Sequence, residues 1–205
     1  MSLFVIADPH LSFSSNKSMD IFKGWSDYTS RLRDNRQSAV SENDTVVVPG
    51  DISWAMNIEE ALNDFKFLNS LNGRKIILKG NHDYWWTTKS KADKFFEANG
   101  LTTLNVLNNN FYSYEDIGIC GTRGWINDGS EPADAKVIRR EAMRLERSIQ
   151  GAVQSGLYPV VFMHYPPVFA ESINDDIMEV LIKYGIKLCF YGHLHGASCS
   201  LAVNG

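Results

Sequence analysis

The five histidines of this 205-residue chain all lie in short motifs that also carry acidic, amide, aromatic or glycine residues. The motifs are Asp8-Pro9-His10, Gly80-Asn81-His82-Asp83, Met163-His164-Tyr165 and Gly192-His193-Leu194-His195, and Gly50-Asp51 adds a further carboxylate. Neutral imidazole, carboxylate and amide oxygen together form the ligand set of a divalent metal site. The pattern therefore predicts a metal site that is assembled from five separate stretches of the chain.

The spacing within the motifs supports this prediction. One residue separates Asp8 from His10, and in an extended backbone that spacing places both side chains on the same side, where they can share an ion. His193 and His195 have the same spacing. Asp51 follows a glycine that permits a sharp turn, and its two oxygens can bridge two cations.

Charge counting favours two metal ions. Two divalent cations bring four positive charges, and among the candidate ligands only Asp8 and Asp51 bring negative ones. The surplus would attract phosphate to a chain whose net charge is −4. Two ions about 3.5–4 Å apart can hold a hydroxide and stabilise both the attacking and the leaving oxygen of a displacement. Such a pair of ions can bind an anionic substrate and hold a bridging hydroxide that attacks it.

His82 lies between the candidate ligand Asn81 and the acidic Asp83. An imidazole that a carboxylate holds is a good proton donor or transition-state stabiliser near neutral pH. We predict that His82 and Asp83 are catalytic, with Asp83 fixing the tautomer of His82. Taken alone, Asp8-Pro9-His10 and Gly50-Asp51 are weak evidence, whereas Gly80–Asp83 and Gly192–His195 are moderately specific. The prediction depends on the order of the motifs and on their positions after separate strands.

The motifs follow apolar runs that read as strands, and helical stretches alternate with these runs. The predicted strands are Leu3–Ala7, Thr45–Val48, Lys75–Leu78, Thr103–Leu107, Phe111–Tyr114, Ile117–Cys120, Val160–His164 and Lys187–Tyr191. The predicted helices are Trp25–Val40, Ile58–Leu71, Lys89–Ala98, Asp134–Gln154 and Asp175–Tyr184. This alternation predicts a layered α/β protein, in which ligands bind at the carboxyl ends of the strands.

The composition limits the possible functions. With 44% hydrophobic and 21% charged residues, we expect one domain with a real core. The net charge of −4 does not support an extended nucleic-acid surface. No apolar run approaches the roughly 18 residues of a membrane segment, and the N-terminus does not read as a signal peptide. Three cysteines, Cys120, Cys189 and Cys199, read as reduced small hydrophobes in a cytoplasmic protein.

In this order the five blocks resemble the calcineurin-like metallophosphoesterase superfamily, whose pattern is D-x-H, G-D, G-N-H-[DE], H and G-H-x-H. The resemblance runs from Asp8 to His195. It implies an α/β fold, a four-layer sandwich of two central mixed sheets flanked by helices, as a single metallophosphoesterase domain over residues 1–205. The family usually has further strands after its last block, so we expect that one or more C-terminal strands are missing, with Ser198–Val203 as the start of one.

The resemblance also implies the ligand assignment. Asp8, His10, Asp51 and His195 would hold one ion, while Asp51, Asn81, His164 and His193 would hold the other. His82 would be the catalytic histidine. The cofactors would be two divalent transition-metal ions, Mn, Fe, Zn, Ni or Co, among which these donors do not choose. Tyr84-Trp85-Trp86 follows His82-Asp83 where the protein-phosphatase branch carries arginine, which argues against a protein phosphatase.

Four further residues near the motifs are candidates for substrate binding. Trp54, Trp85 and Trp125 can stack on a nucleobase or form the wall of an apolar group, and packing beneath the loops is the alternative. Arg123 can contact a phosphate, or it can form an ion pair within its loop.

The leading hypothesis is a metal-dependent phosphohydrolase acting on a small-molecule phosphodiester, pyrophosphate or phosphomonoester. A nuclease of the same superfamily is an alternative, against which the lack of an extended basic surface argues. A noncatalytic metal-binding scaffold is a second alternative, against which the intact ligand set argues. The motifs choose neither the physiological substrate nor the oligomeric state.

Overall fold

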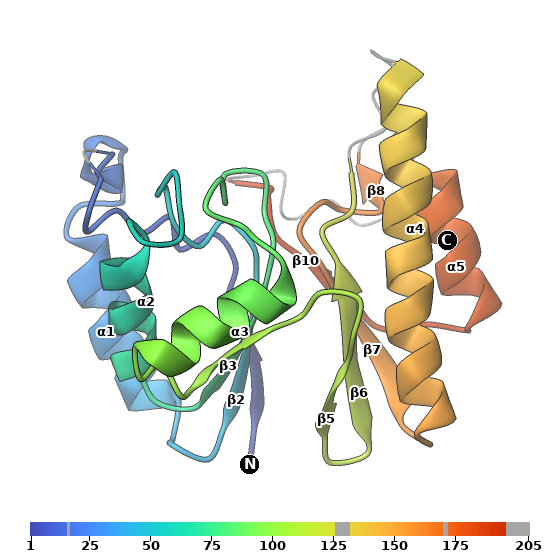
Figure 1. Ribbon diagram of the computed structural model, residues 1–205, viewed down its shortest axis with the longest axis horizontal. Helices are drawn as coiled ribbons and strands as arrows, with labels where there is room; N and C mark the ends of the chain where they lie inside the picture. The colour runs from blue at the N-terminus through green and yellow to red at the C-terminus, as the bar shows by residue number, and fades with distance from the viewer. Residues whose placement is uncertain (16, 126–131, 170–171, 196–205) are drawn as a thin grey trace. The chain divides into compact units, whose positions relative to one another are not determined.

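The computed structural model describes residues 1–15, 17–125, 132–169 and 172–195. The chain forms two compact units, Met1–Val106 and Leu107–Gly205. Each unit contains its own four-stranded sheet with helices beside it (Figure 1).

The first unit is built on a parallel sheet. Its strands β1 (Leu3–Val5), β2 (Thr45–Pro49), β3 (Arg74–Leu78) and β4 (Leu104–Val106) pair in chain order. Between them run the 3-10 helix η1 (Met19–Ile21) and the helices α1 (Tyr28–Ala39), α2 (Leu62–Ser70) and α3 (Lys89–Ala98). Because a helix separates each strand from the next, the chain returns to the same end of the sheet and the pairing is parallel.

The core of the first unit lies where these helices pack on the sheet. Phe65 of α2 and Phe96 of α3 belong to one buried hydrophobic cluster with Val46 and Val48 of β2. Every residue of β2 is buried, as the unbroken apolar run predicted for a strand covered on both faces. The buried strands end together at the carboxyl edge, which is where the predicted ligands begin.

The second unit contains a mixed sheet. Its order is β10 (Cys189–Tyr191), β7 (Tyr158–Met163), β6 (Ile117–Thr122) and β5 (Tyr112–Tyr114), with β5 antiparallel to β6 and the other pairs parallel. The helices are α4 (Pro132–Gln154) and α5 (Asp175–Lys183), and β8 (Val168–Phe169) pairs with β9 (Ser172–Ile173). A side chain at Gly118 would overlap Ala152, so this glycine permits the close packing of α4 on β6.

The predicted α/β class, with two multi-stranded sheets and flanking helices, is confirmed. Two details differ. The first sheet is parallel among the described residues, whereas the resemblance implied mixed sheets. α1 begins at Tyr28 and not at Trp25, because Gly24 and Asp27 both have positive φ angles, 90° and 50°, which a helix does not accept. The β8–β9 pair was not predicted.

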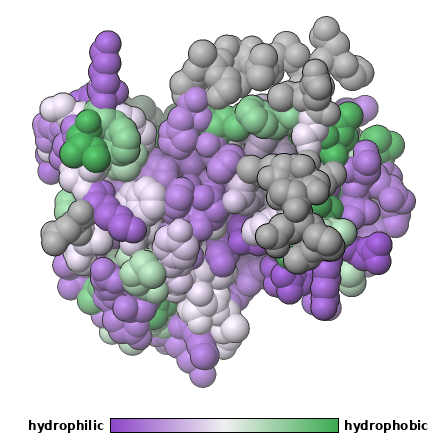
Figure 2. All heavy atoms as spheres, turned by 90° about the horizontal axis from the view of Figure 1, so that it is seen from above, coloured by the Kyte–Doolittle hydropathy of each residue, from purple (hydrophilic) through white to green (hydrophobic). Residues whose placement is uncertain are grey.

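Figure 2 shows a face on which hydrophobic side chains gather only in small groups between hydrophilic ones. Among the described residues, no helix has the length and apolar character that crossing a bilayer requires. Cys120 and Cys189 are free thiols, and burial raises the pKa of each to about 12. Cys199 and the expected strand Ser198–Val203 lie outside the described residues.

Candidate metal centre and catalytic site

The predicted ligands of the first unit follow the ends of its parallel strands. The loops after β1 and β2 run side by side and continue the parallel pairing. The backbone N–H of Asp8 donates to the Gly50 carbonyl at 3.2 Å, and that of His10 donates to the Asp51 carbonyl at 2.9 Å. A third bond joins Leu11 to Ile52 at 2.9 Å. These bonds place the D-x-H motif directly beside the G-D motif.

Three predicted ligands of the first unit have left-handed backbone angles. Asp8, His10 and Asp51 have φ angles of 55°, 45° and 52°, a region that residues with a Cβ seldom adopt. The prediction of an extended backbone between Asp8 and His10 is therefore wrong, because the chain turns at both residues after β1 has ended at Val5. Such backbone conformations cost free energy and are concentrated at functional sites.

Two imidazoles face the carboxylate of Asp51. The Nε2 atom of His10 lies 3.7 Å from Asp51 Oδ2, and that of His82 lies 4.0 Å from the same oxygen. Asp51 Oδ1 accepts a 2.8 Å hydrogen bond from the backbone N–H of His82. Asp51 and His10 are 2% and 4% exposed, whereas His82 is 34% exposed. A buried pair of predicted ligands therefore lies beside a partly exposed imidazole.

The electrostatics of Asp51 suit a bound cation. Burial is the main cause that raises the pKa of Asp51 to about 7; the neighbouring carboxylates of Asp83 and Asp8 act in the same direction, and the hydrogen bond from the His82 backbone acts against them. Carboxylates crowded in a buried site favour the ionised form only when a positive charge joins them. A divalent ion would supply that charge, so the donors and their environment fit a metal.

Gly80 allows the two ligand loops to approach each other. A Cβ at this position would overlap both the carboxylate and the backbone nitrogen of Asp51. Any side chain at residue 80 would therefore displace the central carboxylate of the cluster. Steric overlap thus explains why glycine stands at the first position of the G-N-H motif. Gly50 has a different role, because it makes a turn with a φ angle of 87°.

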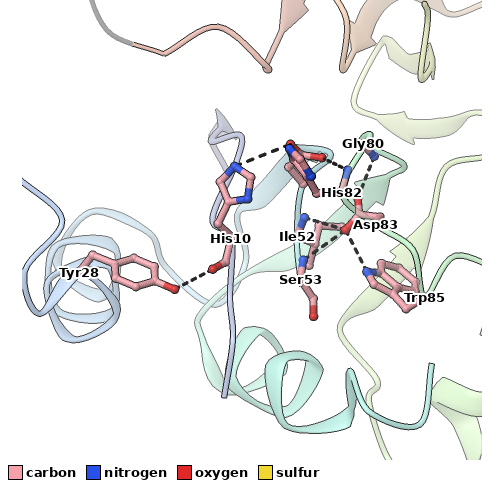
Figure 3. A network of polar contacts seen from close by, with 9 residues as sticks. His10, Tyr28, Ile52, Ser53, Gly80, His82, Asp83 and Trp85 are labelled. Carbon is pink, nitrogen blue, oxygen red and sulfur yellow. Dashed lines mark hydrogen bonds and ion pairs between the residues drawn. The ribbon is translucent and has the colours of Figure 1, made fainter. Parts of the chain in front are cut away.

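Asp83 positions loops and does not orient His82. Its carboxylate is fully buried and accepts hydrogen bonds from the backbone N–H groups of Ile52 at 2.8 Å, Ser53 at 3.2 Å and Gly80 at 2.7 Å. The indole Nε1 of Trp85 is the fourth donor, at 2.9 Å (Figure 3). The prediction that Asp83 fixes the tautomer of His82 is therefore wrong. Asp83 instead ties the loop after β2, which carries Asp51, to the loop after β3, which carries Asn81.

The two tryptophans of this region have different environments. Trp85 is 2% exposed, donates to Asp83 and packs edge-on against Phe65 at 4.7 Å between ring centroids. These contacts favour the packing alternative for Trp85. The ring of Trp54, by contrast, stacks on His10 at 5.0 Å and lies 4.3 Å from the ring of His82. Trp54 therefore adjoins both a predicted ligand and the predicted catalytic histidine.

The second unit brings two of its predicted ligands together. His164 follows β7 and His193 follows β10, and their ring centroids are 5.1 Å apart. The backbone N–H of Gly192 donates to the carbonyls of Met163 at 3.2 Å and His164 at 3.1 Å, which joins the ends of the two strands. His193 also has a left-handed φ of 68°. His195 follows two residues later and is exposed.

Arg123 lies next to the His164 loop. Its carbonyl accepts the backbone N–H groups of His164 at 3.2 Å and Tyr165 at 2.9 Å, and its guanidinium lies 4.5 Å from the Trp125 ring centroid. Burial lowers the pKa of Arg123, while nearby Glu141 raises it. The Nε atom of Arg123 has no hydrogen-bond partner among the described residues. The backbone of Arg123 thus supports the loop, and its side chain has a spare donor for an anion.

Sequence reasoning missed two supporting residues. The Tyr28 hydroxyl donates to the His10 carbonyl at 2.8 Å, and no sequence signal connects that helix residue to the motif. Asp64 accepts hydrogen bonds from the Ser53 hydroxyl and from the backbone N–H of Phe13. Asp64 is 1% exposed in α2, and a carboxylate on the apolar face of a helix is a signal that can be recognised in the sequence.

Comparison with known proteins identifies the family of this chain. The sequence model of the family described as calcineurin-like phosphoesterase matches residues 1–197. The chain belongs to this family. Membership supports metal-dependent phosphoester hydrolysis as the general activity, and the described donors fit that chemistry. No curated protein matches the chain.

Two solved structures are similar to the calcineurin-like phosphoesterase chain at 16% identity. A protein of unknown function from Aquifex aeolicus has a TM-score of 0.46, and the similarity covers 93% of this chain and 89% of that one. The phosphopantetheinyl hydrolase PptH from Mycobacterium tuberculosis has a TM-score of 0.49, with 94% and 82% covered. At this distance neither structure identifies a substrate for this chain.

Proposed function

We propose that this chain is a dinuclear metallophosphoesterase that hydrolyses a small-molecule phosphodiester, pyrophosphate or phosphomonoester. The observation that carries the proposal is the geometry around Asp51. A buried carboxylate and a buried imidazole, His10, lie beside the accessible His82, whose Nε2 is 4.0 Å from the same carboxylate. This arrangement separates metal ligands from a residue that can act on the substrate.

The proposed ligands are divided between two ions. Asp8, His10, Asp51 and His195 would hold one, and the other would be held by Asp51, Asn81, His164 and His193. Asp51 suits the bridging position because both of its oxygens are directed to neighbouring groups, Oδ1 to the His82 backbone and Oδ2 to the imidazoles. Since both compact units contribute ligands, we propose that residues 1–205 act as one functional domain.

The bound ions, Mn, Fe, Zn, Ni or Co, would supply Lewis-acid charge and activate water for attack on phosphorus. The protein residues would donate protons, position the loops and bind the phosphate. His82 would donate a proton to the leaving group or a hydrogen bond to a phosphoryl oxygen, which its 34% exposure permits. Asp83 would keep Asp51 and Asn81 in place through its bonds to Ile52 and Gly80. Arg123 would offer its free Nε donor to the phosphate.

Replacement of Asp51 tests the proposal. Asp51→Asn should lose metal and hydrolysis of bis-p-nitrophenyl phosphate together, because one change weakens the sites of both ions. The matched control is Asp93→Asn, in which the lost carboxylate is 46% exposed and pairs with Lys89 on α3. Elemental analysis and initial rates on the same samples provide the two readouts. An Asp51→Asn variant that keeps its full metal content and rate would contradict the proposed site.

A further inference from the structure

A large cavity of the first unit lies next to Trp54. It has a volume of about 750 Å³ and is formed mainly by the loop that joins His10 to α1. Its walls include Phe13, Ser15, Lys17, Phe22, Tyr28 and Trp54. Drug-sized and cofactor-sized ligands occupy pockets of roughly 300–1,000 Å³, so this cavity is large enough for a small organic molecule. None of the predicted metal ligands lines it.

Trp54 connects this cavity to the catalytic residues. Its indole lines the cavity and at the same time stacks on His10 and lies 4.3 Å from the ring of His82. A phosphoester whose phosphorus lies near His82 would therefore reach the cavity with its organic group. Tyr28 lines the same cavity and donates to the His10 carbonyl, so the wall and the ligand loop are held together.

The cavity offers aromatic surface to a ligand. Phe13 and Phe22 are 49% and 52% exposed although both are large apolar side chains. Both line the cavity together with Trp54. Exposed apolar side chains that gather around a hollow are typical of ligand-binding surfaces. Flat aromatic groups of a ligand would gain the most from these walls, because rings stack well on Phe and Trp.

Two buried polar groups at the same cavity need hydrogen-bond partners. Trp54 Nε1 and Ser15 Oγ are buried and have no partner among the described residues. Buried polar atoms are nearly always paired in native proteins, and leaving them unpaired costs free energy. A pure hydrocarbon ligand would leave both unpaired. A ring that carries nitrogen or oxygen atoms at its edge would satisfy an indole donor and a hydroxyl.

Lys17 adds a positive charge to the aromatic wall. Its ammonium lies 5.0 Å from the centroid of the Trp54 ring, within the range of a cation–π contact. Among the described residues that line the cavity, Asp20 carries the one carboxylate. This carboxylate accepts a 2.6 Å hydrogen bond from the Ser18 hydroxyl, and the backbone N–H of Asp20 donates to the same hydroxyl at 3.1 Å. The ammonium can thus donate to a ring nitrogen or a carbonyl oxygen of the ligand.

We propose that this cavity binds the organic part of the substrate and that this part is a heteroaromatic group of the nucleobase type. Trp54 and Phe22 provide the stacking surface, while Lys17, Ser15 and the indole N–H of Trp54 read the polar edge. The placement of the phosphoester beside the cavity rests on the proposed function, but the binding of the base does not.

Nucleoside binding to metal-free protein tests the cavity without catalysis. Adenosine, guanosine, cytidine and uridine are titrated separately by calorimetry, with benzyl alcohol as an aromatic probe that lacks a heteroaromatic edge. At least one nucleoside should bind saturably and more tightly than benzyl alcohol. Trp54→Leu should weaken that binding about tenfold, the loss expected for one base–aromatic stack. Trp54→Phe should restore most of it, and Lys17→Met should weaken it as well.

Two controls keep this test informative. Tyr158→Leu removes a 46% exposed aromatic side chain of the second unit and should leave nucleoside binding unchanged. Phe22→Ala alters the wall without touching His10, so it reports on the cavity even if Trp54→Leu disturbs the metal loop. If no nucleoside binds the wild-type protein, or if Trp54→Leu, Phe22→Ala and Lys17→Met all bind like wild type, the inference is wrong.

Kinetics separate failure of this inference from failure of the proposed function. With metal-loaded protein, Phe22→Ala should raise KM about tenfold for a methyl phosphodiester of the bound nucleoside, because Phe22 lines the cavity that would hold the base. If the KM for this ester is no lower than that for bis-p-nitrophenyl phosphate and the substitution changes neither value, the inference is wrong while the phosphoesterase function stands. Nucleoside binding that depends on Trp54, without hydrolysis of any phosphoester, would support the cavity and refute the function.

Discussion

At the scale of single residues, His82 differs from the ligands around it in exposure. Its side chain is 34% exposed while His10 and Asp51 are almost completely buried. A residue that must reach the substrate needs this access, and a ligand does not. Exposure therefore supports the division of roles that the sequence motif predicted, with His82 as the proton donor and His10 as a ligand.

His82→Ala should keep its metal and lower kcat by about 10²–10⁴-fold, the usual range for loss of a general acid. The loss should be smaller for a nitrophenolate leaving group, which needs little protonation, than for an alkoxide. Metal analysis and rates on paired aryl and alkyl esters check this expectation. Loss of metal from the variant would show that His82 is a ligand, and an unchanged rate on the alkyl ester would show that it has no catalytic role.

Asp83→Asn should lower both the stability of the folded protein and its affinity for metal. An amide in place of the carboxylate would point N–H groups at some of the four donors from Ile52, Ser53, Gly80 and Trp85. One buried pair left unsatisfied costs about 1–3 kcal/mol, and the loops that carry Asp51 and Asn81 would separate. Urea denaturation and metal titration measure the two effects, with Asp93→Asn as the exposed control. A variant of normal stability and metal affinity but lowered kcat would instead support the orienting role that the structure does not show.

At the scale of elements, the apolar runs predicted the strands well because β2 and β3 are buried along almost their whole length. The loops that follow them were not predictable in conformation. Four predicted ligands, Asp8, His10, Asp51 and His193, have left-handed backbone angles, and no intrinsic preference of these residues requires that. The angles result from the neighbouring chain, for example the bond from the His10 N–H to the Asp51 carbonyl, so only the folded structure reveals them.

Gly80→Ala should abolish metal binding in a protein that still folds. The added methyl group would overlap the carboxylate and backbone nitrogen of Asp51. Gly100→Ala is a matched control, because nothing lies within 4 Å of a Cβ there, although its φ of 67° makes it strained as well. Circular dichroism reports the fold and metal analysis reports the site. Full metal content in Gly80→Ala would show that the loop has room to shift.

Lys75 makes stability depend on pH. It is completely buried at the second position of β3, and burial, with a smaller effect of Arg36, lowers the pKa of its ammonium to about 7. Above pH 7 the folded protein holds Lys75 neutral while the unfolded chain still binds the proton. The unfolded state therefore binds more protons, and stability should rise with pH from about 7 to 9, by at most about 1.4 kcal/mol per unit.

Lys75→Met tests this expectation because it keeps the length of the side chain and removes the titration. Its free energy of unfolding, measured with urea at saturating metal, should lose the rise between pH 7 and 9 that the wild type shows. Equal pH profiles for the two proteins would show that Lys75 remains protonated when buried, held by the carbonyls of Leu71 and Asn69 that accept from its Nζ.

At the scale of the whole molecule, the sequence motifs predicted the family and the candidate ligands, because each motif carries its chemistry in adjacent residues. The supporting network was not predictable in the same way. Asp83 lies within a motif, yet its partners Ile52 and Ser53 are 31 and 30 residues away. Trp54 was one of three equivalent aromatic candidates until its stacking on His10 distinguished it from buried Trp85.

The central claim is that two metal ions together support phosphoester hydrolysis, and a metal titration tests it most directly. Metal-free protein is titrated with Mn²⁺ while bound metal and hydrolysis of bis-p-nitrophenyl phosphate are measured on the same samples. The account predicts that the rate stays low through the first bound equivalent, rises with the second and is constant beyond it. Full activity with one ion or none, or two bound ions without hydrolysis of any phosphoester, would contradict it.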